Sequence, residues 1–350
     1  MAKQSTERAS LGAARSVKND EFYTRIEDIE NELKHYKAHF EGKVVFCNCD
    51  DPEWSNFWRF FHAKFDEYKL SKLIATYRPR VHKGEQVEPG SLMCRTESRD
   101  AKGKPVVERR PLNGDGDFRS KECLDLLDQS DVVVTNPPFS LFREYIATII
   151  GHGKDFLVIG SMNAIGYRDI FPFIKSNKLW LGVTTPKKFK EDIEGTTFKT
   201  LGNACWVTSL THGRRNEWMR LAKTYKGNEG DYPCFDNYNA INVDKTKDIP
   251  VDYAGVMGVP ISFLSVYNPE QFEILGVTQT WSDMRTKIYP QHLLHRPGKP
   301  DANTSILNSA PALAQSCAPA GKTYYSLNGQ IYTTAYVRIL IRNRELNKGA

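Results

Sequence analysis

The sequence lacks the long apolar runs that a membrane-spanning helix needs. None of its apolar stretches approaches the roughly 20 residues that cross a bilayer. The N-terminal segment MAKQSTERASLGAARSVKND also has no apolar stretch of the kind that marks a secretory signal. We therefore expect a cytoplasmic protein with no membrane contact, in which residues 1–19 form a flexible basic tail.

Cysteine is scarce and has no metal-binding spacing. The chain has seven cysteines, an odd number, with no C-x-x-C pair and no cysteine–histidine cluster at the spacing of a zinc site. Cys47 and Cys49 alternate within an apolar run, which places them on the same side of a strand. We expect reduced core thiols and no structural metal.

A glycine-rich phosphate loop is also missing. No G-x-G follows the first predicted strand, although NAD and ATP sites need many backbone N–H donors around their phosphates. A cofactor without phosphates fits this sequence better. The net charge of +6 is mild for 350 residues, so it permits a polyanionic partner without requiring one.

Strands and helices alternate along the first half of the chain. The helices are amphipathic, and Thr24 followed by Glu27 predicts a capping box for a helix over residues 24–40. The strands are apolar throughout, which is typical of a parallel sheet covered on both faces. We predict an α/β core over residues 20–185, with a mostly parallel sheet and strands at KVVFCNC, KLIATY, DVVVTN, DFLVIGS and LWLGVTT.

Elsewhere this pattern changes. Residues 78–112 are charged and contain glycine and proline, which predicts a surface insertion. Residues 186–350 form a second, smaller region with some returning core strands, and Asn328-Gly329 predicts a hairpin turn there. Residues 297–322 carry few order-forming signals, and we expect a mobile loop.

Polar residues follow two strands at the edge where ligands bind in doubly wound sheets. Asp50, Asp51 and Pro52 either hold the amino group or hydroxyls of a nucleotide-like cofactor, or initiate an Asp-Pro turn. Asp117 and Phe118, in NGDGDF, either accept a hydrogen bond from an adenine amino group and pack on its ring, or belong to a Gly/Asp turn before a helix. From the residues alone, both interpretations stay open.

The stretch DVVVTNPPFS ends a buried strand on a rigid turn. Pro137 pushes Asn136 toward an extended backbone, so the Asn136 side-chain oxygen and the Pro137 carbonyl can converge on one planar amino group. Two acceptors on such an amine expose its lone pair, and Phe139 offers a stacking face worth about 1–3 kcal/mol per base. The alternative is a plain turn.

The order DEFYT, CNCDDPEWSNF, NGDGDF, NPPF resembles the S-adenosylmethionine-dependent, adenine-specific DNA methyltransferases, and most closely the EcoRI-type family. MGVPISFLSVYNPEQFEILG and the C-terminal YVRILIR add to the likeness, which spans about residues 19–345. The resemblance implies a Rossmann-like methyltransferase fold. It departs from methyltransferases in general because the first-motif glycines are missing and the second strand ends in Tyr77-Arg78 instead of an acid.

The likeness also implies roles for matching residues. Phe22, Tyr23 and Thr24 would cover the methionine part of the cofactor. Asp50, Asp51 and Pro52 would form a variant of the first methyltransferase motif, and Asp117 and Phe118 would line the pocket for the cofactor's adenine. The catalytic motif would be Asn136, Pro137, Pro138 and Phe139.

The implied reaction is methyl transfer from S-adenosylmethionine to the 6-amino group of adenine in a specific double-stranded DNA sequence, by base flipping, with S-adenosylhomocysteine as product. Residues 186–350 would contain the target-recognition region. The candidate phosphate contacts are equally well explained as solubility charges; they are Lys187, Lys188, Arg214 and Arg215.

The expected setting is the cytoplasm of a bacterium, with a bacterial or phage-encoded monomer bound to the nucleoid through DNA. A cognate restriction enzyme is one open alternative, and a solitary protective enzyme is the other. Two other functions stay open: an amino-methyltransferase acting on RNA adenine or protein glutamine, and a catalytically silent DNA-binding relative.

Overall fold

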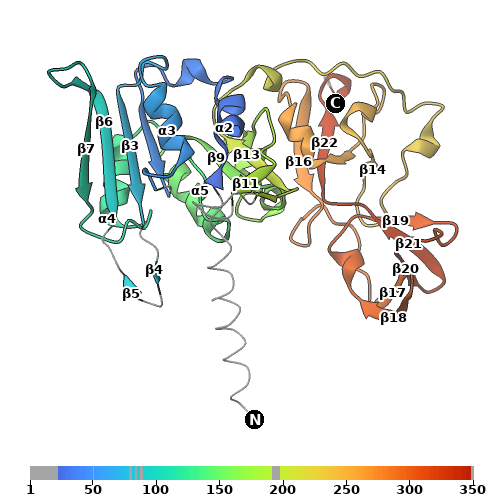
Figure 1. Cartoon of the computed structure of the whole chain (residues 1–350). Helices are drawn as coiled ribbons and strands as arrows, with labels where there is room; N and C mark the ends of the chain where they lie inside the picture. The colour runs from blue at the N-terminus through green and yellow to red at the C-terminus, as the bar shows by residue number, and fades with distance from the viewer. Residues whose placement is uncertain are drawn as a thin grey trace, which may run out of the picture. The chain divides into compact units, whose positions relative to one another are not determined.

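The computed structural model describes residues 23–49, 51–78, 81–82, 85–86, 90–190 and 198–347. Phe22, Asp50 and the predicted tail lie outside the described residues. The chain divides into two compact units (Figure 1), and the division differs from the predicted boundary at 185. Unit 1 is Met1–Ala164 with Leu179–His212, and unit 2 is Ile165–Lys178 with Gly213–Ala350.

Unit 1 is built on an eight-stranded sheet. Its strands, in spatial order, are β10 (Trp180–Leu181), β13 (Ala204–Thr208), β9 (Asp155–Ser161), β8 (Val132–Thr135), β2 (Val44–Asn48), β3 (Lys72–Tyr77), β6 (Ser91–Arg99) and β7 (Pro105–Pro111). The central four, β9-β8-β2-β3, are parallel, and the two outer pairs join them antiparallel. The sheet is therefore mixed, not mostly parallel.

The outer strands explain why the sequence did not predict the antiparallel part of the sheet. β6 and β7 fall in the segment predicted as a surface insertion, and β7 has its side chains mostly exposed. An edge strand needs little apolar surface, so its charged residues hide it from a search for buried strands. β8, by contrast, is buried at every position, which agrees with the apolar VVVT pattern.

Helices pack on this sheet. The first three helical segments are α2 (Ile26–Leu33), η1 (Lys37–His39) and α3 (Asn56–Ala63), and α2 and α3 share one buried cluster with alternate residues of the central strands. The next two are α4 (Lys121–Gln129), which contacts β2, and α5 (Phe142–Gly151), which contacts β9. No helix among the residues that the structure describes has the length and apolarity to cross a bilayer.

The predicted capping box at the first helix is wrong. Thr24 lies in a short strand, β1 (Tyr23–Thr24), and the helix begins after Arg25, which makes no side-chain capping hydrogen bond. β1 pairs antiparallel with β11 (Lys188–Lys190), which in turn pairs with β12 (Phe198–Thr200). Pairing with β11 fixes Thr24 in an extended backbone that the local sequence pattern could not reveal.

Unit 2 contains the short helix α6 (Phe171–Lys175) and two sheets. One has the order β14 (Ile241–Asn242), β15 (Met257–Pro260), β22 (Arg338–Asn343) and β16 (Phe272–Val277). The other has the order β18 (Lys299–Thr304), β17 (His292–Arg296), β20 (Tyr324–Leu327), β21 (Gln330–Thr334) and β19 (Ala312–Gln315). In unit 1, the two-residue strands β4 (Val81–His82) and β5 (Glu85–Gln86) pair as a separate antiparallel hairpin.

Two predictions for unit 2 have opposite outcomes. The hairpin turn is confirmed, because Asn328 and Gly329 both have positive φ, 50° and 82°, between paired strands β20 and β21. The segment predicted as a mobile loop, 297–322, is not a loop throughout, since β18 and β19 both lie within it. Because β18 (KPDANT) and β19 (ALAQ) contain proline and small residues, they have no clear alternation of apolar and polar residues, and the sequence did not predict them.

Candidate active site

The order of the central strands reverses between β2 and β8. The chain runs from β2 to β3 on one side and later returns to β8 and β9 on the other. Ligands of open α/β sheets bind outside the carboxyl ends of the strands at such a point. The two motifs at these ends are the segment leading to Asp51-Pro52 after β2 and Asn136–Phe139 after β8.

Buried hydrogen bonds join the ends of these two strands. Thr135, the last residue of β8, donates from Oγ1 to the carbonyl of Asn48, the last residue of β2, at 2.5 Å. The Tyr145 hydroxyl, from α5, donates to Asn48 Oδ1. Phe118 packs edge-on against the Tyr145 ring, with centroids 5.1 Å apart. Tyr145, on the helix that follows NPPF, therefore contacts residues of two other predicted motifs, a role that sequence reasoning missed.

The predicted catalytic residues, Asn136–Phe139, lie between β8 and α5. Asn136 is half-buried, Pro137 is buried, and Pro138 is in an extended backbone before a 3₁₀ turn, η2 (Phe139–Leu141), that continues into the helix. Phe139 is half-buried and packs partly against the core cluster beneath the sheet. Strand β8 before Asn136 and the two prolines after it thus fix the backbone on both sides of this residue.

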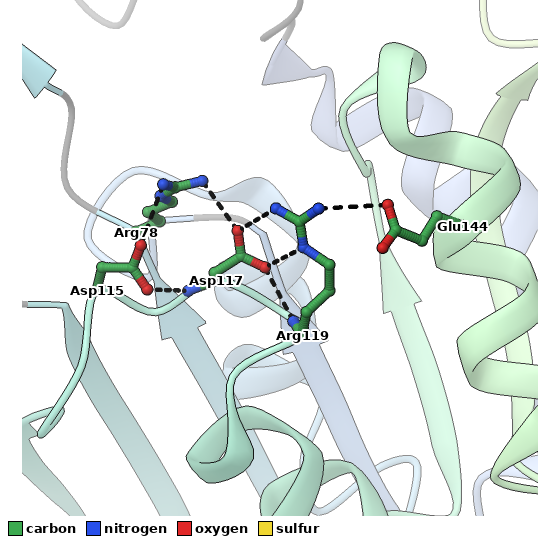
Figure 2. Close-up of polar contacts among 5 residues, drawn as sticks. All are labelled: Arg78, Asp115, Asp117, Arg119 and Glu144. Carbon is green, nitrogen blue, oxygen red and sulfur yellow. Dashed lines mark hydrogen bonds and ion pairs between the residues drawn. The ribbon is translucent and has the colours of Figure 1, made fainter.

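Asp117 lies in a network of arginines (Figure 2). Arg119 donates from Nε to Asp117 Oδ1 at 2.8 Å and from Nη2 to Oδ2 at 2.7 Å, and its backbone N–H reaches Oδ1 at 2.9 Å. Arg78, just after β3, donates to Asp117 Oδ2 at 3.0 Å and pairs with Asp115 at 3.1 Å. Arg119 also pairs with Glu144 at 3.3 Å.

These contacts fill the acceptor capacity of Asp117. Hydrogen bonds from the Arg119 side chain, with its backbone N–H and Arg78 adding to them, hold the pKa of Asp117 below its ordinary value. An ionised carboxylate has about four acceptor positions, and four donors occupy them here. An amino group that binds Asp117 must therefore displace a donor, and half-exposed Arg78, which makes only one hydrogen bond to Asp117 and would keep its pair with Asp115, is the most easily displaced.

Asp51 forms the turn that was predicted as the alternative to a cofactor contact. Its Oδ1 accepts from the Glu53 N–H at 2.9 Å, and its carbonyl accepts from the Ser55 N–H at 2.6 Å. Ser55 then caps α3 by accepting from the Phe57 N–H at 3.1 Å. A turn and a ligand contact do not exclude each other, so the cofactor role of Asp51 stays a prediction.

Asn56 links two motifs that are distant in sequence. Its Nδ2 donates to the Thr24 carbonyl at 2.7 Å and so fastens β1 to the start of α3. The register then sets Tyr23 opposite Lys190 and Thr24 opposite Phe189. The S-N-F that follows DDPEW was the only sequence signal for this contact.

The four predicted phosphate contacts separate into two groups. Lys187, Lys188 and Arg214 are exposed. Arg215 is only 2% exposed, hydrogen-bonds Asn177, and lies 5.7 Å from the centre of the Tyr267 ring. Burial lowers its pKa to about 10. Arg215 as a phosphate contact is therefore a wrong prediction, because a buried guanidinium packed in this way has no access to DNA.

Among the described residues, no group of three or more histidine, cysteine, aspartate or glutamate side chains is placed to hold a metal ion. The candidate site thus consists of strand-end amides, carboxylates, arginines and aromatic rings. Such groups can bind and orient a nucleoside and an amine, which suits group transfer between two bound partners.

Comparison with known proteins identifies the family. The model of the family described as adenine-specific methyltransferase EcoRI matches residues 10–344. Type II methyltransferase M.EcoRI of Escherichia coli is 45% identical over 296 residues, which is 79% of this chain and 90% of that protein. Type II methyltransferase M.MpnI of Mycoplasma pneumoniae is 39% identical over 279 residues, covering 75% of this chain and 83% of that protein.

A third relative, Type II methyltransferase M.MgeORF184P of Mycoplasma genitalium, is 38% identical over 280 residues, covering 75% of this chain and 84% of that protein. No solved structure matches the chain significantly. The family resemblance drawn from the sequence motifs is confirmed. The chain belongs to the EcoRI family of adenine-specific methyltransferases.

Proposed function

We propose that this methyltransferase transfers a methyl group from S-adenosylmethionine to the 6-amino group of adenine in a specific double-stranded DNA sequence. The observation that carries the proposal is the NPPF motif at the switch point between β2 and β8, in a chain of this family. The four central parallel strands, with helices packed on them, support a Rossmann-like arrangement of unit 1.

The target adenine must leave the duplex, at a cost of a few kcal/mol, before its amino group can reach the site. Asn136 Oδ1 and the Pro137 carbonyl accept the two amino hydrogens, and Phe139 stacks on the base. The nitrogen lone pair would then take the methyl group as the carbon–sulfur bond of the donor breaks, and the methylated nitrogen would release one of its two protons to solvent. The rate gain comes from positioning and fixed dipoles, because the prolines and α5 hold the acceptors in place.

The donor would lie across the carboxyl ends of β2 and β3. Asp117 would accept the donor's adenine amino group in place of Arg78, and Phe118, which packs against Tyr145, would pack on that ring. Tyr23 and Thr24 would cover the methionine part, with Asp51-Pro52 nearby after β2. S-adenosylmethionine has no phosphate, which agrees with the absence of a glycine-rich loop.

Unit 2 would recognise the target sequence, and Lys187, Lys188 and Arg214 would contact phosphates. We propose a cytoplasmic monomer that associates with the nucleoid through DNA. A cognate restriction enzyme would cut the same sequence when it is unmethylated, and a solitary enzyme would protect DNA by itself.

The test is the change Asn136→Ala. Methyl transfer to DNA should be abolished, whereas S-adenosylmethionine should bind within about twofold of wild type, measured by calorimetry on the same preparation. Asn163→Ala is the matched control, since Asn163 is an exposed asparagine just after β9. Transfer that persists in the Asn136 variant would remove the residue from catalysis.

A second change probes the donor site. Asp117→Ala should weaken S-adenosylmethionine binding well beyond twofold, because it removes the acceptor and the carboxylate that orders both Arg78 and Arg119. An unchanged affinity would exclude Asp117 from the donor pocket. DNA, RNA and protein acceptors offered side by side separate DNA methylation from methylation of RNA adenine or glutamine, and donor binding without any transfer would indicate a silent relative.

A further inference from the structure

The five-stranded sheet of unit 2 lies in a segment with almost no acidic residues. Residues 286–336 contain a single acid, Asp301, although the whole chain has 42 acids against 48 bases. The same segment carries four basic residues, Lys287, Arg296, Lys299 and Lys322, of which Lys287 pairs with Asp236 at 2.6 Å. The sheet region is therefore positive in a chain that is otherwise close to neutral, which is the charge that a polyanion attracts.

The two faces of this sheet differ in chemistry. One face is a small core: Tyr325 and Tyr332 pair across β20 and β21 and pack with Tyr289 and Leu307. The other face, which we call the reading face, shows one cross-strand row and part of a second. The first row is Leu293, Ser326, Ile331 and Gln315, and the second contains His295 and Tyr324.

Hydrogen bonds hold the polar side chains of the reading face in place. Gln315 Nε2 donates to Thr333 Oγ1 at 3.1 Å. The His295 Nε2 atom lies 2.7 Å from Ser326 Oγ, and the imidazole stacks on Tyr324 with centroids 4.4 Å apart.

The one acid on this face is also engaged. Asp301 Oδ1 lies 2.9 Å from His295 Nδ1. The reading face therefore presents amide, hydroxyl and aromatic groups on rigid strands. On β19 the reading face ends at Leu313, because this side chain packs against a buried cluster that contains Phe235 and Tyr238.

We propose that the reading face contacts base edges in the major groove of the target DNA, with Arg296, Lys299 and Lys322 on the surrounding phosphates. Base edges are read by amide and hydroxyl groups, and β-strands are one of the elements that enter the groove. Carboxylates facing phosphates would be repelled, and this face has only the one that His295 engages. The inference rests on the proposed function and narrows target recognition to one sheet.

The experiment compares methylation contexts for wild type and three variants on unmethylated phage genomic DNA, by modification-sensitive sequencing. Gln315→Ala and Ser326→Ala should reduce the kcat/KM preference for the wild-type site over sites that differ by one base, by roughly 5- to 150-fold. Gln330→Ala is the matched control, because alternation along β21 sets Gln330 on the opposite face, and its preference should be unchanged.

Lys299→Gln and Lys322→Gln should weaken binding equally for all sequences. Each should lower the slope of log K against log salt by about 0.9. Donor affinity, measured for every variant, should stay at the wild-type value, which shows that unit 1 is intact.

Two failures are distinguishable. Unchanged site preference in both Gln315→Ala and Ser326→Ala, with salt slopes unchanged in the lysine variants, would overturn the reading face while DNA methylation itself persists. Absence of DNA methylation by the wild-type chain would instead overturn the proposed function, and the reading face with it.

Discussion

The loop that carries Asp117 depends on a glycine without a side chain. Gly116 has φ +77°, and a Cβ there would lie 2.5 Å from the Tyr77 carbonyl oxygen and 3.2 Å from Arg78 Cα. Both neighbours are backbone atoms at the end of β3, so no side-chain rotation can relieve the overlap. Gly116→Ala must therefore push the loop away from β3 and separate Arg78 from Asp115 and Asp117.

The loss of donor affinity in Gly116→Ala can be estimated from the backbone strain alone. An alanine in the left-handed region costs about 1–2 kcal/mol before any overlap is counted. If donor binding requires the undistorted loop, that strain is added to the free energy of binding. Each 1.4 kcal/mol is a factor of ten, so S-adenosylmethionine should bind at least about fivefold more weakly. Calorimetric titration of the DNA-free enzyme measures this directly.

Gly114 provides a control two residues away. A Cβ at Gly114 meets nothing within 4 Å, and its φ lies outside the left-handed region. Gly114→Ala should therefore leave donor affinity within about twofold of wild type. Equal affinities for the Gly116 and Gly114 variants would refute the claim that close approach of this loop to β3 shapes the donor site.

Three further outcomes follow from the described contacts. Tyr145→Phe should lower the free energy of unfolding by about 1–3 kcal/mol in urea titrations, because it leaves Asn48 Oδ1 buried without that donor. Lys188→Gln should lower the salt slope of duplex binding by about 0.9, measured by fluorescence anisotropy, whereas Arg215→Gln should not. The stabilisation from the depressed pKa of Asp117 is present above its ordinary pKa of 3.8 and is lost as pH falls through the lower folded value, so wild type and Asp117→Asn should converge in unfolding free energy only below pH 3.8.

The sequence predicted those parts of the fold whose local pattern is decided by burial. The strands β2, β3, β8 and β9 are apolar because helices cover both faces, and that pattern is visible in a single sequence. The outer strands β6 and β7 are stabilised by pairing with a neighbour and need few apolar residues, so nothing local distinguishes them from a surface loop.

The candidate site shows the same division. Asn136–Phe139 could be proposed because a rigid turn after a buried strand has a recognisable composition, and Asp117-Phe118 because a Gly/Asp turn before a helix has one as well. Tyr145 was missed because its ring belongs to an ordinary amphipathic helix, and only the fold brings its hydroxyl to Asn48. Arg215 was assigned wrongly for a related reason: a Gly-Arg-Arg sequence is exposed in most settings, and its burial here depends on Asn177 and Tyr267.

The arginine in place of an acid after β3 has an electrostatic consequence. The network around Asp117 holds two guanidinium groups and three carboxylates, so at neutral pH it carries one net negative charge. In the proposed reaction the donor is a net cation, since its sulfonium and ammonium outnumber its single carboxylate, whereas the demethylated product has no net charge. The field of the network therefore favours donor over product, although solvent screens part of it. An acid at position 78 would add two negative charges relative to arginine and leave Asp117 without a displaceable partner. If the donor binds at Asp117 as proposed, Arg78 would limit the net negative charge that attracts it to one and would keep the Asp117 carboxylate ordered in the free enzyme.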